Sequence, residues 1–310
     1  MIIDLEQTTV STVAKKLVSV REEGGAVALG RVLTLIIKSD HRPSEEAIEA
    51  ANDASREHPM RVIVLVTHPG DEAKLDAQIR VGGDAGASEV IVLSAYGEAG
   101  SNPEALVTGL LLPDAPVVVW WPDSVPDSPS ADPLGRIAQR RITDSSKQGA
   151  GAADRLQALD EVYVPGDTDL AWTRLTRWRE QLAAVLDQPP YEPVTAVEVR
   201  GASTSPSTAL LAAWLGMALD VTVDWTYEDA SDWDHGIHSV RLTRASGDIL
   251  LERQSQTHAK LTQPGQPDHE LLLPRRSLRE CLAEELRRLD ADALYGRVIT
   301  EGWDALKQPA

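Results

Sequence analysis

The chain has 310 residues, more than one typical domain core, and a formal net charge of −18 at pH 7. This acidic balance argues against nucleic acid and anionic membrane surfaces as partners, because both need a basic protein surface. No segment has the apolar length of a bilayer span, and the first residues lack the basic and hydrophobic blocks of a signal peptide, so we expect a cytoplasmic protein. The only cysteine, Cys281, excludes an internal disulfide and an all-cysteine metal site.

Strands and helices are predicted to alternate in the first half of the chain. Thr8 or Thr9 can cap a first helix that ends at Gly24-Gly25. Further helices are expected at 43–57, 72–80 and 103–111, and strands at 32–37, 61–67, 89–94, 116–121 and 161–164. This alternation predicts a mainly parallel sheet with helices on both faces, in an N-terminal α/β domain of residues 1–166.

The pattern changes in the second half of the chain. Helices are expected at 169–187, 206–219, 277–289 and 293–306, the third of them opened by the capping box Ser277-Leu-Arg-Glu280. A strand is expected at 196–200, followed by β-type runs at 221–227, 237–243, 249–254, 258–262 and 269–273. We expect these runs to form an antiparallel meander, with a hairpin turn at 245–248, in a C-terminal α+β domain of residues 167–310.

A polar motif follows the buried-looking strand at residues 115–123. The strand ends in Trp120-Trp-Pro-Asp123, and after a long loop the chain reads Arg140-Arg-Ile-Thr-Asp-Ser-Ser146, whose arginines we expect in a loop outside the core. Ligands and partners of open α/β sheets bind beyond the carboxyl ends of the strands. The predicted partner-binding residues are therefore Trp120, Trp121, Asp123, Arg140, Arg141, Thr143, Asp144 and Ser145. The alternative is structural: both Trp pack under helices, Arg141 pairs with Asp144, and the hydroxyls cap a helix.

Two weaker candidate sites lie in the second half. Ser203, Thr204, Ser205 and Ser207 stand between a strand and a helix, where hydroxyls and free N–H groups can hold an anion, although helix capping alone also explains them. Residues 229–238 include Asp232, Asp234, His235 and His238, which could meet a divalent cation or form a solvated acidic loop. We favour the acidic loop and predict no metal site.

Signatures of catalysis are missing from the sequence. Gly82-Gly-Asp-Ala-Gly86 has the wrong spacing for a dinucleotide fingerprint, and there is no phosphate-binding Walker loop, no Gly-x-Ser-x-Gly elbow and no catalytic cysteine context. Sites built from dispersed residues leave no such trace. We predict no catalytic residue and no cofactor.

Four long strings, in order along nearly the whole chain, resemble the OpcA family, the glucose-6-phosphate dehydrogenase assembly proteins of bacteria. They are Val13–Leu35, the Trp120–Asp123 and Arg140–Ser145 motifs, Asp169-Leu-Ala-Trp-Thr-Arg-Leu-Thr-Arg-Trp-Arg179, and Ser205–Leu215. The resemblance implies a non-catalytic assembly factor or allosteric activator of glucose-6-phosphate dehydrogenase in the oxidative pentose phosphate pathway. The alternative is a protein or enzyme that binds a sugar phosphate or nucleotide, with 203–207 or 140–146 as an anion cradle.

Overall fold

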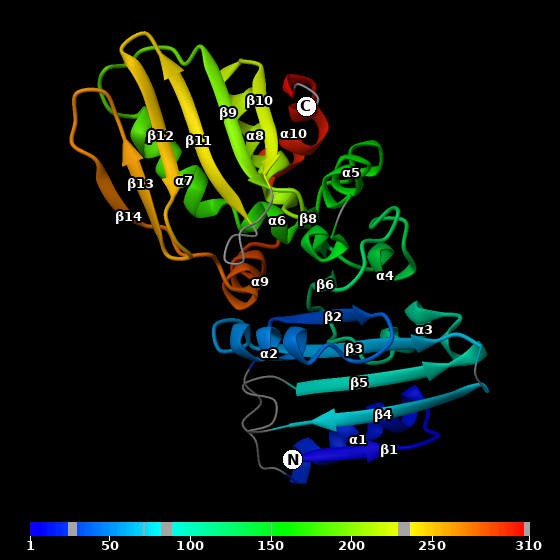
Figure 1. Cartoon of the computed structure of the whole chain (residues 1–310). Helices are drawn as coiled ribbons and strands as arrows, with labels where there is room; N and C mark the ends of the chain where they lie inside the picture. The colour runs from blue at the N-terminus through cyan, green and yellow to red at the C-terminus, as the bar shows by residue number, and fades with distance from the viewer. Residues whose placement is uncertain (24–29, 71, 82–88, 150, 229–235, 307–310) are drawn as a thin grey trace. The chain divides into compact units, whose positions relative to one another are not determined.

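The computed structural model describes the chain except for residues 24–29, 71, 82–88, 150, 229–235 and 307–310 (Figure 1). The chain forms two compact units, both discontinuous in sequence. Unit 1 comprises residues 1–144, 166–168 and 277–291, and unit 2 comprises residues 145–165, 169–276 and 292–310. The predicted boundary after residue 166 stays a prediction, because a compact unit need not be a part that folds independently.

Unit 1 is built on an eight-stranded sheet in the order β1-β4-β5-β3-β2-β6-β7-β8. The strands are β1 (Ile2–Leu5), β2 (Leu33–Ser39), β3 (Met60–His68), β4 (Lys74–Arg80), β5 (Glu89–Tyr96), β6 (Val117–Trp121), β7 (Arg140–Thr143) and β8 (Asp167–Asp169). From β5 to β7 neighbouring strands are parallel, whereas β1 and β4 run antiparallel at one edge. The predicted mainly parallel sheet is confirmed, and its central strands are buried runs of β-branched residues.

In unit 1 the predicted caps at Thr9 and Ser277 open helices, whereas the second helix begins at Glu45 instead of Pro43 and the short helix at 133–136 is not predicted from the sequence. The helices of this unit are α1 (Val10–Glu23), α2 (Glu45–Ala54), α3 (Pro103–Thr108), α4 (Pro133–Arg136) and α9 (Leu278–Arg287), with a 3₁₀ turn η2 at Gly97–Gly100. Thr9 Oγ1 accepts the Thr12 N–H at 3.2 Å, and the apolar side of α1 joins the core beneath the sheet through Val13 and Leu17. Helices α2 and α9 lie side by side, and Arg279 pairs with Asp53 between them at 3.4 Å.

Two predicted elements of the first half are wrong. Residues 74–80 form strand β4 instead of a helix, because Leu75, Ala77 and Ile79 alternate with polar residues at a period of two and enter the core together. Residues 160–162 form the 3₁₀ turn η4 (Asp160–Val162) in place of a strand.

Unit 2 carries a six-stranded sheet in the order β10-β9-β11-β12-β13-β14. The strands are β9 (Ala196–Ala202), β10 (Val223–Glu228), β11 (Ile237–Arg244), β12 (Gly247–Arg253), β13 (His258–Thr262) and β14 (His269–Leu272). The predicted antiparallel meander is confirmed from β11 to β14. Strand β10 instead lies parallel to β9, on the side away from β11, because the connection through a helix returns it in the same direction.

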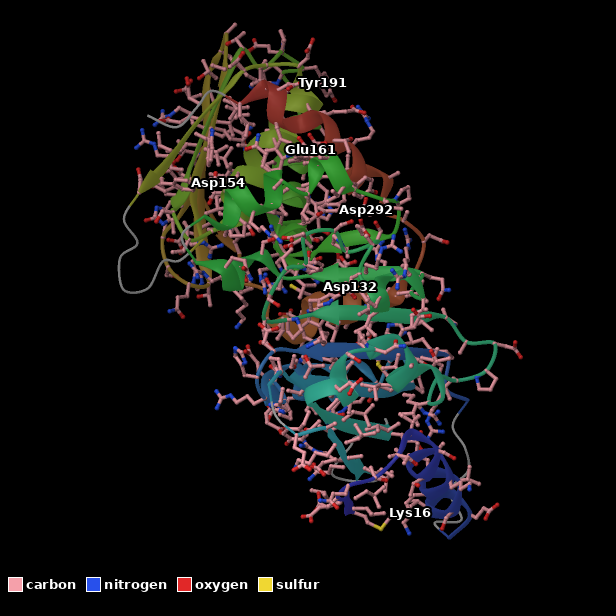
Figure 2. The ribbon with its side chains drawn as sticks, turned by 90° about the vertical axis from the view of Figure 1, so that its right-hand side faces the viewer. Lys16, Asp132, Asp154, Glu161, Tyr191 and Asp292 are labelled. Carbon is pink, nitrogen blue, oxygen red and sulfur yellow. The ribbon has the colours of Figure 1, made fainter. Side chains whose placement is uncertain are left out.

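The helices of unit 2 lie on one face of this sheet or beside it. They are α5 (Ala152–Gln157), α6 (Leu170–Thr173), α7 (Thr176–Leu186), α8 (Pro206–Leu219) and α10 (Ala293–Glu301), with 3₁₀ turns η3 (Ser145–Gln148), η4 and η5 (Gly302–Ala305). The helix expected over 169–187 is divided at Arg174–Leu175, whereas α8 has its predicted bounds. Asp292, labelled in Figure 2, caps α10 and accepts the Trp172 indole N–H at 2.9 Å. None of the helices in the described part of the chain has the length and apolar composition of a bilayer span.

The capping box of α9 gives a first prediction. Ser277 Oγ accepts the Glu280 N–H at 3.3 Å, and Glu280 Oε2 accepts the Ser277 N–H at 2.8 Å. Ser277→Ala leaves the Glu280 N–H without its Oγ acceptor, so the free energy of unfolding should fall by about 1 kcal/mol in urea denaturation. Glu280→Gln keeps an acceptor oxygen and should cost less; equal losses for the two variants would contradict this account of the cap.

Candidate functional site

The two tryptophans of the first predicted site are core residues. Trp120 and Trp121 end β6 and are 0% and 3% exposed, in register with Ile142 and Thr143 of β7. Trp121 belongs to the hydrophobic cluster beneath the sheet, while the Trp120 indole N–H has no hydrogen-bond partner among the described residues. Asp123, two residues past the strand, is exposed. The structural alternative therefore describes both tryptophans.

The two arginines lie on strand β7, and their expected place on a loop is wrong. Arg140 donates to Glu285 Oε2 at 2.5 Å and to the Asp290 carbonyl at 3.0 Å. Arg141 Nε donates to Asp167 Oδ1, and Arg141 Nη1 donates to the Ala138 carbonyl at 3.0 Å. Both guanidinium groups are buried against carboxylates of unit 1, which neutralise charges that would be costly to bury alone.

The three polar residues after the arginines are buried too. The Thr143 hydroxyl donates to the Thr168 carbonyl at 3.1 Å, and Asp144 is 1% exposed. The Ser145 hydroxyl and N–H both bind Asp169 Oδ2, at 2.6 and 3.0 Å, and Asp169 also caps α6. These contacts hold residues 167–169 in place. A role of the eight residues in partner binding stays a prediction, with Asp123 as their one exposed side chain.

The second predicted site opens onto a cavity of unit 2. Thr204, Ser205 and Ser207 line it at the start of α8, whereas Ser203 is exposed and outside the lining. Ser205 is the N-cap residue of α8, yet its side chain makes no cap hydrogen bond, so the capping alternative fails for that hydroxyl. Ser207 Oγ donates to the Ala171 carbonyl at 2.8 Å.

Five arginines, which sequence reasoning missed, also line this cavity. They are Arg174, Arg177, Arg253, Arg275 and Arg276. They come from three separate segments, the α6–α7 region, the end of β12 and the residues after β14, so spacing along the chain carries no signal of their convergence.

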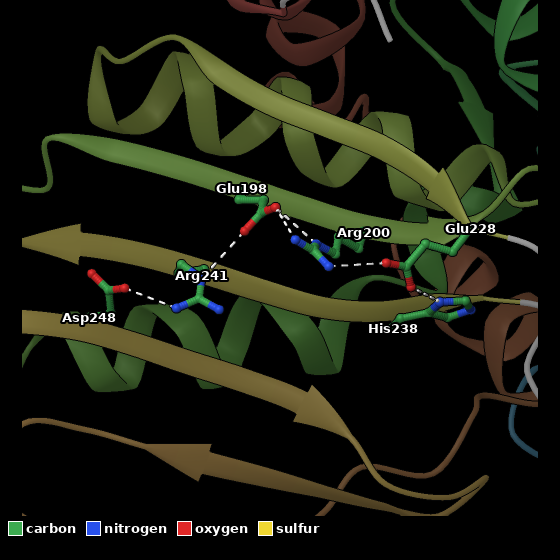
Figure 3. A network of polar contacts seen from close by, with 6 residues as sticks. All are labelled: Glu198, Arg200, Glu228, His238, Arg241 and Asp248. Carbon is green, nitrogen blue, oxygen red and sulfur yellow. Dashed lines mark hydrogen bonds and ion pairs between the residues drawn. The ribbon is translucent and has the colours of Figure 1, made fainter. Parts of the chain in front are cut away.

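A polar network covers the face of the unit 2 sheet opposite the helices (Figure 3). It runs across four strands through Glu228, Arg200, Glu198, Arg241 and Asp248, in ion pairs of 2.6 to 3.3 Å. His238 Nδ1 lies 3.0 Å from Glu228 Oε2, and this hydrogen bond, aided by Arg200, lowers the pKa of Glu228.

Most residues of the candidate cation site at 229–238 lie outside the part of the chain that the structure describes. Asp232, Asp234 and His235 lie outside the described residues, and His238 binds Glu228 as stated. Within the described ranges no three His, Cys, Asp or Glu side chains are grouped as a metal site requires.

The fold defines a protein of two α/β units, one with a mainly parallel sheet and one with a mainly antiparallel sheet. Residues 51–162 match the domain described as the glucose-6-phosphate dehydrogenase subunit N-terminal domain, and residues 165–299 match the corresponding C-terminal domain. These two matches cover most of the sequence in order, and the chain belongs to the OpcA family.

Two relatives carry the same description, "Putative OxPP cycle protein OpcA". The protein of Nostoc punctiforme is 26% identical over 202 residues, which are 59% of this chain and 43% of that protein. The protein of Synechocystis is 28% identical over 167 residues, 49% of this chain and 34% of that protein. The chain thus spans less than half the length of these curated relatives.

Solved structures are similar only at a distance. An oxidoreductase from Sinorhizobium meliloti has 10% identity and a TM-score of 0.46, covering 88% of this chain and 94% of that one. Glucose-6-phosphate 1-dehydrogenase from Mycobacterium avium has 12% identity and a TM-score of 0.41, covering 89% of this chain and 91% of that one.

The burial of Arg141 gives a second prediction. Arg141→Ala leaves Asp167 buried without its guanidinium, so the free energy of unfolding should fall by about 3 to 5 kcal/mol in urea denaturation. Arg136→Ala is the matched control in unit 1, since Arg136 and its partner Glu104 are 59% and 40% exposed and should contribute about 1 kcal/mol or less. Similar stability of the two variants would refute the assignment of Arg141 as a buried structural residue.

The Glu228–His238 contact gives a third prediction. Because the pKa of Glu228 is lower in the folded chain than in the unfolded chain, its carboxylate stabilises the fold at pH values above the ordinary pKa of glutamate. This stabilisation is lost as the pH falls through the lowered pKa. His238→Ala removes the hydrogen bond and should raise the pKa of Glu228, measured by carboxyl ¹³C NMR titration. Arg241→Gln lies in the same network but does not touch Glu228, and should leave this pKa where it is. An unchanged pKa in the His238 variant would count against the contact.

Proposed function

We propose that this chain is a non-catalytic accessory subunit of glucose-6-phosphate dehydrogenase that promotes the assembly or activity of the enzyme in the oxidative pentose phosphate pathway. The observation that carries the proposal is the match of both subunit domains, in order, over most of the chain. The description of two relatives as OxPP cycle proteins supports the pathway. The proposal places the chain in the cytoplasm with its partner enzyme.

The absence of catalytic signatures from the sequence supports an accessory role without a cofactor. A protein of this kind acts by binding one state of its partner more tightly than another, because equal affinity for both states shifts nothing. The chain therefore has to recognise a feature that only the active assembly presents.

The eight residues of the first predicted site support the proposal because they shape the surface at the ends of strands β6 and β7. Seven of the eight are buried, so we propose that they fix the β6 and β7 ends while exposed Asp123 contacts the partner. A rigid scaffold lowers the entropic cost of ordering a binding surface.

The proposal predicts activation in a reconstituted assay. At limiting concentration of the dehydrogenase from the same source, added chain should raise the rate of NADPH formation by about fivefold or more, the lower end of typical coupling between sites. Size-exclusion chromatography should show a larger assembly, and the chain alone should form no NADPH. Serum albumin at equal concentration is the control. An unchanged rate together with an unchanged elution profile at saturating chain would sink the proposal.

A further inference from the structure

One edge of the unit 2 sheet carries backbone groups that face away from the sheet. Strand β14 is the last strand of this sheet, next to β13 (Figure 1). The Leu273 N–H donates to the Thr257 carbonyl at 2.8 Å, which fixes the phase of the antiparallel ladder. Every second residue of such a ladder directs its N–H and C=O groups to the neighbouring strand. Leu271 therefore bonds to β13, whereas Glu270 and Leu272 direct their backbone groups outward.

The outward groups of Glu270 and Leu272 make no hydrogen bond with any other part of the chain that the structure describes. Both side chains are exposed as well, and that of Leu272 is 74% exposed. Strand edges are commonly protected by a lysine or a bulge, but β14 contains no lysine and keeps an unbroken register with β13. Another extended backbone offers donors and acceptors at the spacing of these groups.

An antiparallel pairing of two copies of β14 around a two-fold axis has to keep each face of the sheet continuous, which allows few registers. An axis at Glu270 sets two Glu270 carboxylates opposite each other, and an axis at His269 sets Glu270 opposite Asp268. Both registers bring like charges together, which is destabilising. An axis at Leu272 sets Glu270 opposite Pro274, which has no N–H to donate.

An axis at Leu271 avoids these conflicts. It sets Glu270 opposite Leu272 of the second copy, so that every outward N–H and C=O group of both residues gains a partner. Glu270 then lies between Lys260, its neighbour on β13, and the apolar Leu272 side chain, and no two carboxylates face each other. The half-buried Leu271 side chains of the two copies meet on the other face.

We infer that β14 pairs edge to edge with β14 of a second copy of this chain, in the register centred on Leu271. The six-stranded sheets of the two copies would then continue through the interface. Pro267 and Pro274 confine the pairing to this short edge, which is smaller than the interface of a stable dimer, so the association is weak and reversible. The inference concerns unit 2 alone and does not depend on the proposed association with a dehydrogenase.

Analytical ultracentrifugation of the full chain tests the association. Between about 10 µM and 1 mM chain, the sedimentation coefficient should rise from that of a monomer toward that of a dimer, with a Kd of about 100 µM, as suits a small interface. A monomer at every concentration overturns the inference. Growth beyond a dimer overturns it as well, because a two-fold pairing closes at two copies.

Two substitutions of Leu272 test the place of contact. Leu272→Pro removes an outward N–H that β13 does not use, so the strand should persist while dimerisation weakens by about tenfold or more. Leu272→Thr keeps this N–H and is the matched control, with a smaller loss. Equal dimerisation of the folded proline variant and the unaltered chain overturns the inference.

An exchange of charge tests the register and replaces the proline variant if that variant unfolds. Leu272→Glu sets a carboxylate opposite Glu270 of the second copy and should weaken dimerisation by about tenfold, since the repulsion occurs twice. Adding Glu270→Lys turns both repulsions into attractions and should restore dimerisation. Both positions are exposed, so the fold should tolerate these changes. Dimerisation unaltered by Leu272→Glu, or not restored by Glu270→Lys, overturns the proposed pairing.

Discussion

The ion pairs of strand β7 hold unit 1 together across breaks in its sequence. The chain leaves this unit after Asp144 and returns to it twice, at 166–168 and at 277–291. Arg141 binds Asp167 of the first return, and Arg140 binds Glu285 of the second. The backbone takes part too, since the Arg141 N–H donates to the Gly166 carbonyl at 2.9 Å. A buried guanidinium is tolerated only with its carboxylate in place, so each return segment has one register in which both charges are paired.

This need for partners from distant segments also explains which elements can be predicted from the sequence and which cannot. Central strands such as β3 and the helix α8 are continuous apolar runs, and their burial needs no knowledge of a partner. Strand β7 reads as a polar loop, because Arg140 and Arg141 become core residues only through carboxylates 145 and 26 residues further along the chain. The segment of β4 is short enough for its apolar residues to fit the period of a helix as well as that of a strand. Antiparallel pairing with β5 selects the strand.

The candidate sites follow the same division between local and distant signals. The hydroxyl cluster near Ser205 lies within a few residues of a helix start, so the sequence is consistent with a helix cap or a weak anion site there. The arginines of the cavity gather from three segments, and tertiary packing alone brings them to α8. Conversely, Trp120 and Arg141 have the residue types of interface anchors, but residue type does not fix exposure, and the sheet buries both.

Buried and half-buried arginines make two kinds of contact in this acidic chain. On β7, and at Arg61 with Glu89, guanidinium groups contact carboxylates in the core, where opposite charges cancel and the pair fixes register. In unit 2, Arg177, Arg253 and Arg276 donate to carbonyl oxygens, which orient the guanidinium groups. Interactions of the first kind stabilise a fold by local neutrality. Contacts of the second kind tie a guanidinium to the backbone of a distant segment, as Arg177 is tied to Pro274, Arg253 to Leu273 and Arg276 to Thr173.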